Sequence, residues 1–118
     1  MDGIDAIEIS GNNFKKLNQP TPYFLENALK IRNKVNVPII LVGGFRNVNQ
    51  MNNALEKGID FISMSRPFIA DENFVQKLKN DEESICVNCN ECFEIFKTQH
   101  KRCALRKDII HQLEINFP

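Results

Sequence analysis

A continuous apolar run, Pro38–Val42, is the feature that most constrains the fold of this chain. Such a run is typical of a strand that lies inside a parallel sheet and is covered on both faces. Gly43 and Gly44 end this strand, because glycine tolerates the backbone conformation of a tight turn. Successive parallel strands need a crossover, usually a helix. The run therefore predicts a chain in which strands and helices alternate.

Short apolar segments and amphipathic stretches do alternate over the first 80 residues, in the order βαβαβα. Thr21 is expected to cap the first helix with Pro22 at its first position, and Asn47 to cap the second, which Gly58 ends. This order predicts an α/β fold with a parallel sheet and right-handed crossovers. The expected strands are 6–10, 38–42 and 61–64, and the expected helices are 22–34, 47–57 and 73–79.

Three βα units form either part of a (β/α)₈ TIM barrel or a small doubly wound sheet, and periodicity does not distinguish the two. The segment Gly3–Ile7 favours part of a barrel, because it looks like the end of a helix that runs into a strand. We therefore expect residues 1–80 to form the C-terminal part of a barrel. The acidic segment Asp81–Glu83 links them to a cysteine-rich extension, residues 81–118.

Composition excludes several classes of function. Fifteen basic residues balance fifteen acidic ones, so no net charge attracts nucleic acid or an anionic membrane. The longest apolar runs are far too short to span a bilayer. The N-terminus has neither a basic leader nor an apolar stretch of signal-peptide length, so the cytoplasm is the expected location.

Two successive strands end in residues suited to holding an anion. Gly43 and Gly44 let backbone amides approach a ligand closely. Ser65 and Arg66 follow the next strand, and the arginine can bind phosphate oxygens with two parallel hydrogen bonds. In a (β/α)₈ barrel, the loops after the seventh and eighth strands form a recurrent phosphate site. An ordinary tight turn and a surface arginine are the alternative for each turn, but their joint occurrence favours a ligand site.

The same segments resemble the NADH:flavin oxidoreductase family, the Old Yellow Enzyme group. Pro38–Arg46 and Gly58–Asp71 are similar to its last two barrel strands, and Asp5–Gly11 to the strand before them. Cys86–Asn90 resembles the cysteine motif that follows the barrel in many members. The resemblance covers roughly residues 3–103 and keeps the order and spacing of the family.

This resemblance implies an FMN-binding barrel that passes hydride from NAD(P)H to the flavin and then to an activated alkene or another acceptor. It assigns the FMN phosphate to the amides of Gly43 and Gly44, the amide of Ser65 and the side chain of Arg66. Ser65 stands where the family usually has glycine. No catalytic residue of the family matches a position in this chain, and Tyr23 is expected to pack. The chain is therefore expected to be a fragment that is inactive alone.

All four cysteines lie in one short segment, which favours a metal site or reduced thiols over a secreted disulfide scaffold. Four thiolates with short spacings can bind a four-iron cluster or zinc, and free thiols are the third alternative. Related branches of the family carry a 4Fe–4S cluster at slightly longer spacings. The candidate metal ligands are Cys86, Cys89, Cys92 and Cys103.

Two other functions compete with the flavin hypothesis. One is a non-catalytic metal-binding or interaction module that keeps a phosphate site, and the other is a different phosphate-binding barrel, such as one acting on a sugar phosphate. A part-barrel would also expose the edges of its sheet. We therefore expect a dimer, or association with a complementary half-barrel.

Overall fold

The computed structural model describes residues 3–11, 22–98 and 102–105. Its three strands form one parallel sheet in the order β1-β2-β3. This confirms the predicted alternation of strands and helices and is compatible with part of a barrel. The elements are β1 (Ile7–Ile9), α1 (Leu25–Arg32), β2 (Ile39–Val42), α2 (Val48–Glu56), β3 (Phe61–Ser63), α3 (Arg66–Ala70), α4 (Phe74–Lys79) and α5 (Glu91–Thr98).

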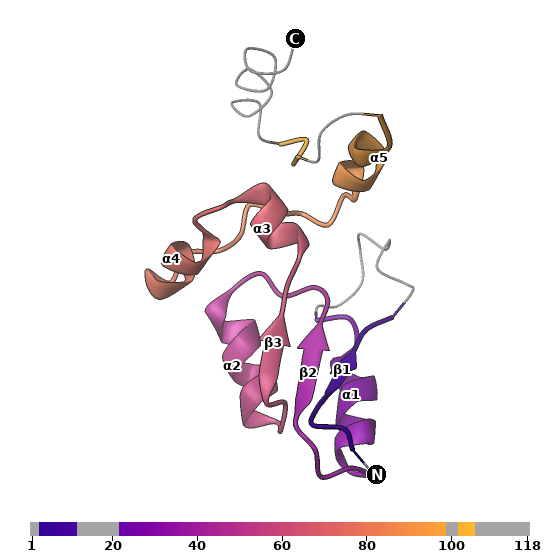
Figure 1. Cartoon of the computed structure of the whole chain (residues 1–118). Helices are drawn as coiled ribbons and strands as arrows, with labels where there is room; N and C mark the ends of the chain where they lie inside the picture. The colour runs from indigo at the N-terminus through magenta and orange to yellow at the C-terminus, as the bar shows by residue number, and fades with distance from the viewer. Residues whose placement is uncertain (1–2, 12–21, 99–101, 106–118) are drawn as a thin grey trace.

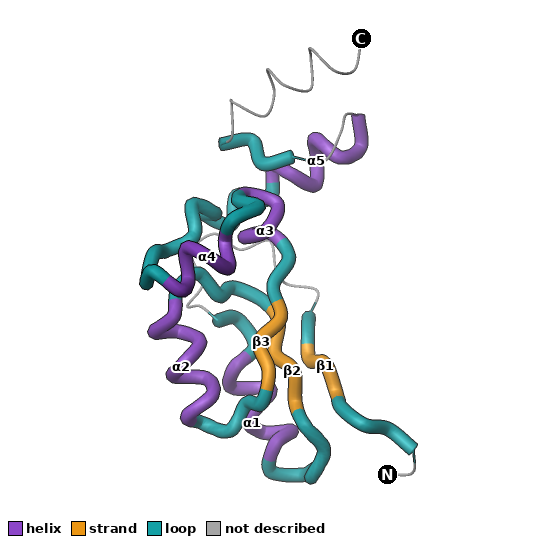
Figure 2. Tube along the Cα trace, turned by 60° about the vertical axis from the view of Figure 1, so that its left-hand side comes forward, coloured by secondary structure: helices purple, strands orange, loops and turns teal. Residues whose placement is uncertain are grey.

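The helices fall into two groups. α1 and α2 lie against one face of the sheet (Figure 2). α3 follows the carboxyl end of β3, and the segment leading to α5 continues beyond that end (Figure 1). Within the described residues, none of the helices is long and apolar enough to cross a bilayer. α3 and the segment that leads to α5 therefore lie beyond the carboxyl ends of the strands, where ligands of parallel α/β folds bind.

The core lies between the sheet and its two covering helices. Ile39 and Leu41 of β2 are fully buried, and Ala28 of α1 and Ala54 of α2 are small enough to let their helices approach the strands. Burial of such aliphatic side chains is the main source of stability. This face of the central strand is covered as predicted.

The opposite face of the sheet is less covered than the apolar run predicts. Ile40 and Val42 are half-buried, and Phe61, which pairs with Ile40, is 58% exposed. Side chains alternate between the two faces of a strand, so these residues share the face away from α1 and α2. Within the described residues, the strand is thus buried on one face and partly open on the other.

The second helix begins and ends as predicted, whereas the first does not. The side chain of Asn47 accepts a hydrogen bond from the N–H of Gln50 at 2.9 Å, which caps α2. α1 begins only at Leu25, so the prediction of Pro22 at the first helical position is wrong. The N–H of Tyr23 donates to the carbonyl oxygen of Gly43 instead, which holds this segment in a turn. Thr21 lies outside the described residues.

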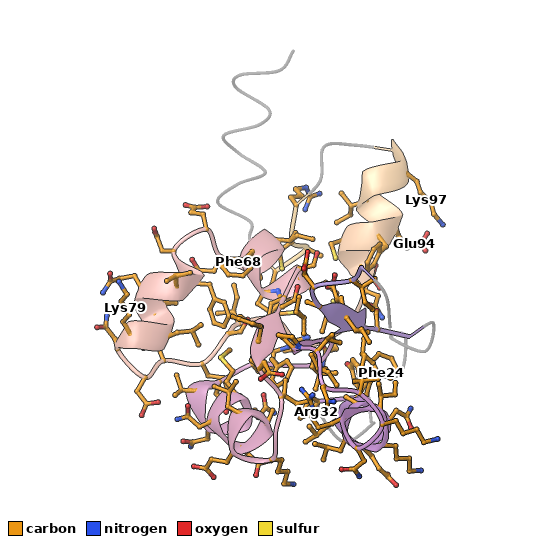
Figure 3. All side chains as sticks on the ribbon, turned by 60° about the horizontal axis from the view of Figure 1, so that its bottom comes forward. Phe24, Arg32, Phe68, Lys79, Glu94 and Lys97 are labelled. Atoms are coloured by element: carbon orange, nitrogen blue, oxygen red, sulfur yellow. The ribbon has the colours of Figure 1, made fainter. Side chains whose placement is uncertain are left out.

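Two helices were not expected from the sequence. α3 is only five residues long, and its Phe68 packs edge-on against Phe74 of α4, with ring centroids 5.6 Å apart. α5 carries an ion pair between Glu94 and Lys97 at 3.2 Å on its exposed surface (Figure 3). α3 is the more relevant of the two to the candidate site, because it begins at Arg66.

Candidate anion-binding site

Gly43 and Gly44 form the turn after β2, as the sequence predicts. Their φ angles are 118° and 85°, in the left-handed region that favours glycine. A Cβ atom at Gly43 would lie 3.3 Å from the ring of Phe24. Glycine at this position therefore serves both the backbone conformation and the close packing of the segment before α1.

The side chain of Arg66 is held on two sides. Arg66 as a whole residue is only 8% exposed. The Nη1 group donates a hydrogen bond to Oδ1 of Asn90 at 2.6 Å, and Cζ lies 6.0 Å from the centroid of the Tyr23 ring. A buried guanidinium keeps its charge and needs hydrogen-bond acceptors. The position of Arg66 is thus set by one residue that precedes it in the sequence, Tyr23, and one that follows it, Asn90.

One pocket brings the two turns together at the carboxyl ends of β2 and β3. All four residues predicted to bind phosphate line this pocket. The location agrees with the general rule that ligands bind beyond the carboxyl ends of parallel strands. The lining consists of Val42, Gly43, Gly44, Phe45, Arg46, Met64, Ser65, Arg66 and Pro67.

Arg46 is a site residue that the sequence analysis did not single out for binding. The preceding Phe45 is fully buried in the core, which holds the backbone of Arg46 at the pocket. Arg46 itself is 6% exposed, and its Nη1 group donates to the carbonyl oxygen of Phe45. Its Nε and Nη2 groups are buried without a hydrogen-bond partner. A charged residue two positions after the glycine turn that ends an apolar strand was the signal available in the sequence.

The electrostatics around Arg46 favour an incoming anion. Burial lowers the pKa of Arg46, and the neighbouring charge of Arg66 lowers it further, against opposing contributions from Cys86, Tyr23 and Glu83. The hydroxyl group of Tyr23 is also buried without a hydrogen-bond partner. An anion bound here would offset the repulsion between two guanidinium groups and supply acceptors for unpaired donors.

The cysteines surround a second pocket, which shares Arg66 with the first. All four line it, together with Asn90 and parts of α3, and all four are free thiols. Within the described segments, no group of three or more histidine, cysteine, aspartate or glutamate side chains lies close enough to hold a metal ion. Four thiols are a suitable set of ligands for zinc or an iron–sulfur cluster, but the described residues form no such metal-binding group.

Cys92 and Cys103 are the two buried thiols of this pocket. Cys92 is 8% exposed, and burial raises the pKa of its thiol, with nearby Cys86 adding to the shift and Arg66 opposing it. Only the thiolate is a strong nucleophile or metal ligand. The raised pKa favours the protonated thiol of Cys92 in the folded chain.

Comparison with known proteins identifies the family. The model of the NADH:flavin oxidoreductase / NADH oxidase family matches residues 2–84, which include both glycines and Arg66. The chain belongs to this family. The resemblance inferred from the two turns is thereby confirmed, and the flavin after which the family is named is the ligand to test against the pocket.

Two curated relatives are similar over most of the chain. A 4,4'-dithiodibutanoate disulfide reductase of Rhodococcus erythropolis is 30% identical over 90 residues, which make up 75% of this chain and 22% of that protein. An N,N-dimethylglycine/sarcosine dehydrogenase of Chromohalobacter salexigens is 29% identical over 96 residues, 78% of this chain and 14% of that protein. The chain thus spans less than a quarter of either relative. No solved structure matches it significantly.

The residues of the pocket fit the phosphate group of FMN. Arg46 offers two unpartnered buried donors, and Arg66 adds a second guanidinium to the lining. Gly43 and Gly44 lack side chains that would keep a ligand from the backbone. A dianionic phosphate would be bound by two cations in a partly desolvated pocket, where hydrogen bonds to charged groups are strongest.

Proposed function

We propose that this chain carries the phosphate-binding part of the FMN site of an NAD(P)H-dependent flavin oxidoreductase. The observation that carries the proposal is the pair of unpartnered buried donors on Arg46, in a pocket also lined by Arg66. A buried unpaired cation costs free energy. Binding of a phosphate group would offset that cost, because its oxygens would accept hydrogen bonds from the unpartnered donors.

Each group has a distinct part in binding. Arg46 and Arg66 neutralise the phosphate and donate to its oxygens. The backbone at Gly43 and Gly44 lets amide groups approach the same oxygens, and Ser65 adds the amide before Arg66. The flavin itself, when bound, supplies the chemistry of accepting hydride from NAD(P)H and passing it to an acceptor. The residues of this chain anchor the end of the cofactor that does not react.

A titration with inorganic phosphate, followed by amide NMR of the full chain, tests this function. We expect the largest shifts at the amides of Gly43 and Gly44 and at the Nε–H groups of Arg46 and Arg66. Replacing both arginines by methionine should abolish these shifts. Phosphate-dependent shifts confined to exposed lysines, with none at the pocket, would contradict the proposal.

We further propose that the chain does not turn over alone, and that its acceptor is bound by other parts of a larger enzyme. The chain corresponds to 22% of a disulfide reductase and 14% of a dehydrogenase, so the substrates named for those relatives are not assigned to it. Incubation of the chain with FMN, NADPH and an enone checks this point. Robust reduction of the alkene would contradict it.

The uncovered face of the sheet supports association with a further part-barrel. Phe61 is 58% exposed on β3, and β1 and β3 form the two edges of the described sheet. Exposed edges and apolar side chains favour pairing with other strands. We propose a dimer or a complex with a complementary half-barrel, and a monodisperse monomer by light scattering would contradict this.

A further inference from the structure

The side chain of Asn90 connects the cysteine segment to the phosphate pocket. Asn90 lies between Cys89 and Cys92, and its Oδ1 atom accepts the 2.6 Å hydrogen bond from Nη1 of Arg66. Asn90 and Arg66 are 24 positions apart in the sequence, so this contact joins the extension to the carboxyl end of the sheet. Asn90 also has a φ angle of 65°, a conformation that asparagine tolerates better than most residues.

A second contact places the same segment against the other arginine. The N–H of Ser84 donates to the carbonyl oxygen of Arg46 at 2.9 Å, and the hydroxyl oxygen of Ser84 accepts from the N–H of Cys86 at 3.1 Å. The start of the cysteine segment is therefore bonded to the first turn, and Asn90 to the second. The segment lies close to both cations of the pocket.

We propose that Asn90 is a positioning residue, which holds the guanidinium of Arg66 ready for the phosphate. The proposal rests on the function proposed above and adds a residue outside the barrel strands to the flavin site. Fixing a long side chain before binding reduces the conformational entropy lost on binding. Asn90 does not touch the phosphate in this account and acts only through Arg66.

The chemistry of an amide suits this part. A neutral amide oxygen accepts a hydrogen bond from Arg66 and leaves its positive charge available to the phosphate. A carboxylate at the same place would accept the bond equally well but would neutralise the charge and repel the anion. The two acceptors are nearly the same size, so exchanging one for the other separates position from charge.

The experiment measures phosphate affinity in variants of the full chain by NMR titration with inorganic phosphate. Asn90→Gly removes the acceptor while glycine tolerates the positive φ angle, and we expect the dissociation constant to rise by about tenfold. The Nε–H signal of Arg66 should also lose the narrow, slowly exchanging character of an ordered side chain. Asn90→Asp should weaken phosphate binding at least as much, although it restores an acceptor.

Asn88→Gly is the matched control. Asn88 lies in the same segment with a φ angle of 63°, is 7% exposed, and its Oδ1 atom has no hydrogen-bond partner within the described residues. This variant should keep the wild-type phosphate affinity.

Two results would overturn the proposal, and they differ in what they imply. If the wild-type chain binds phosphate in the pocket and Asn90→Gly binds it equally well, Asn90 does not position Arg66 and the flavin function stands. If the wild-type chain shows no phosphate binding in the pocket, the proposed function fails and the role of Asn90 fails with it. Should Asn90→Gly not fold, Asn90→Ala, which also removes the acceptor, takes its place in this comparison.

Discussion

Arg46 and Arg66 follow the carboxyl ends of two paired strands, and both side chains line the same pocket. Arg66 lowers the pKa of Arg46, in addition to the larger effect of burial. The two cations therefore destabilise each other in the absence of an anion. Removing one of the two charges should therefore preserve or raise the stability of the chain and lower its affinity for phosphate.

Replacement of Arg46 by methionine tests that pair of predictions. Methionine has a similar length and no charge, so Arg46→Met removes a buried cation whose Nε and Nη2 groups lack partners. In phosphate-free buffer, we expect a free energy of unfolding that is unchanged or up to about 2 kcal/mol higher. Phosphate affinity should fall by roughly tenfold or more. Urea unfolding and phosphate titration measure the two effects.

Arg32 provides a matched control for this change. Its Nη1 group pairs with Asp60 at 2.8 Å and its Nη2 group donates to the carbonyl oxygen of Val35 at 2.7 Å, at the opposite end of the strands. Arg32→Met should lower the free energy of unfolding and leave phosphate affinity unchanged. A loss of stability in Arg46→Met as large as that in Arg32→Met would contradict the account.

A second prediction concerns the conformation of the glycine turn. Gly43 and Gly58 have nearly identical φ angles, 118° and 117°, so an alanine at either position should cost about 1–3 kcal/mol of stability. Only the first lies at the pocket. Gly43→Ala should therefore also weaken phosphate binding, because the added methyl group would displace Phe24 or the turn itself.

Gly58→Ala should match that loss of stability without any change in affinity, since a Cβ atom there meets only Arg32 at 3.5 Å. Thermal unfolding and phosphate titration of both variants make the comparison. Equal losses of affinity in the two would show that the turn has no special part in binding.

The turns could be predicted from the sequence because their chemistry is local. Two glycines directly after an apolar run predict a turn there, and Arg66 was found by its place just after the next predicted strand. Both predictions use only adjacent residues. The cap of α2 was predictable for the same reason, since Asn47 acts on Gln50, three residues ahead.

The missed features depend on contacts between distant segments. α1 begins at Leu25 rather than Pro22, because the N–H of Tyr23 bonds to Gly43 far along the chain. Arg46 is buried beside the second turn, and its carbonyl oxygen accepts a hydrogen bond from the distant Ser84. α3 was missed for a different reason, because five residues are too few to show a helical period.

A third prediction follows from the raised pKa of Cys92. Below about pH 8 the thiol is protonated in both states and contributes nothing to pH dependence. As the pH rises past about 8.5, the unfolded chain loses this proton first, so the unfolded state is favoured and stability falls. The wild-type chain should therefore lose more stability between pH 8 and pH 10 than Cys92→Ala.

Urea unfolding at a series of pH values, under reducing conditions, measures this difference. The two curves should diverge only on the alkaline side. Curves that stay parallel over the whole range would mean that Cys92 ionises as readily in the folded chain as in the unfolded one.

The most direct test of the central claim compares FMN with riboflavin, which lacks only the phosphate group. Equilibrium dialysis of the full chain should show binding of FMN and at least about tenfold weaker binding of riboflavin. The double variant Arg46→Met, Arg66→Met should lose this preference. Equal binding of the two flavins to the wild-type chain, or a preference for FMN that survives in the double variant, would contradict a phosphate site formed by these two arginines.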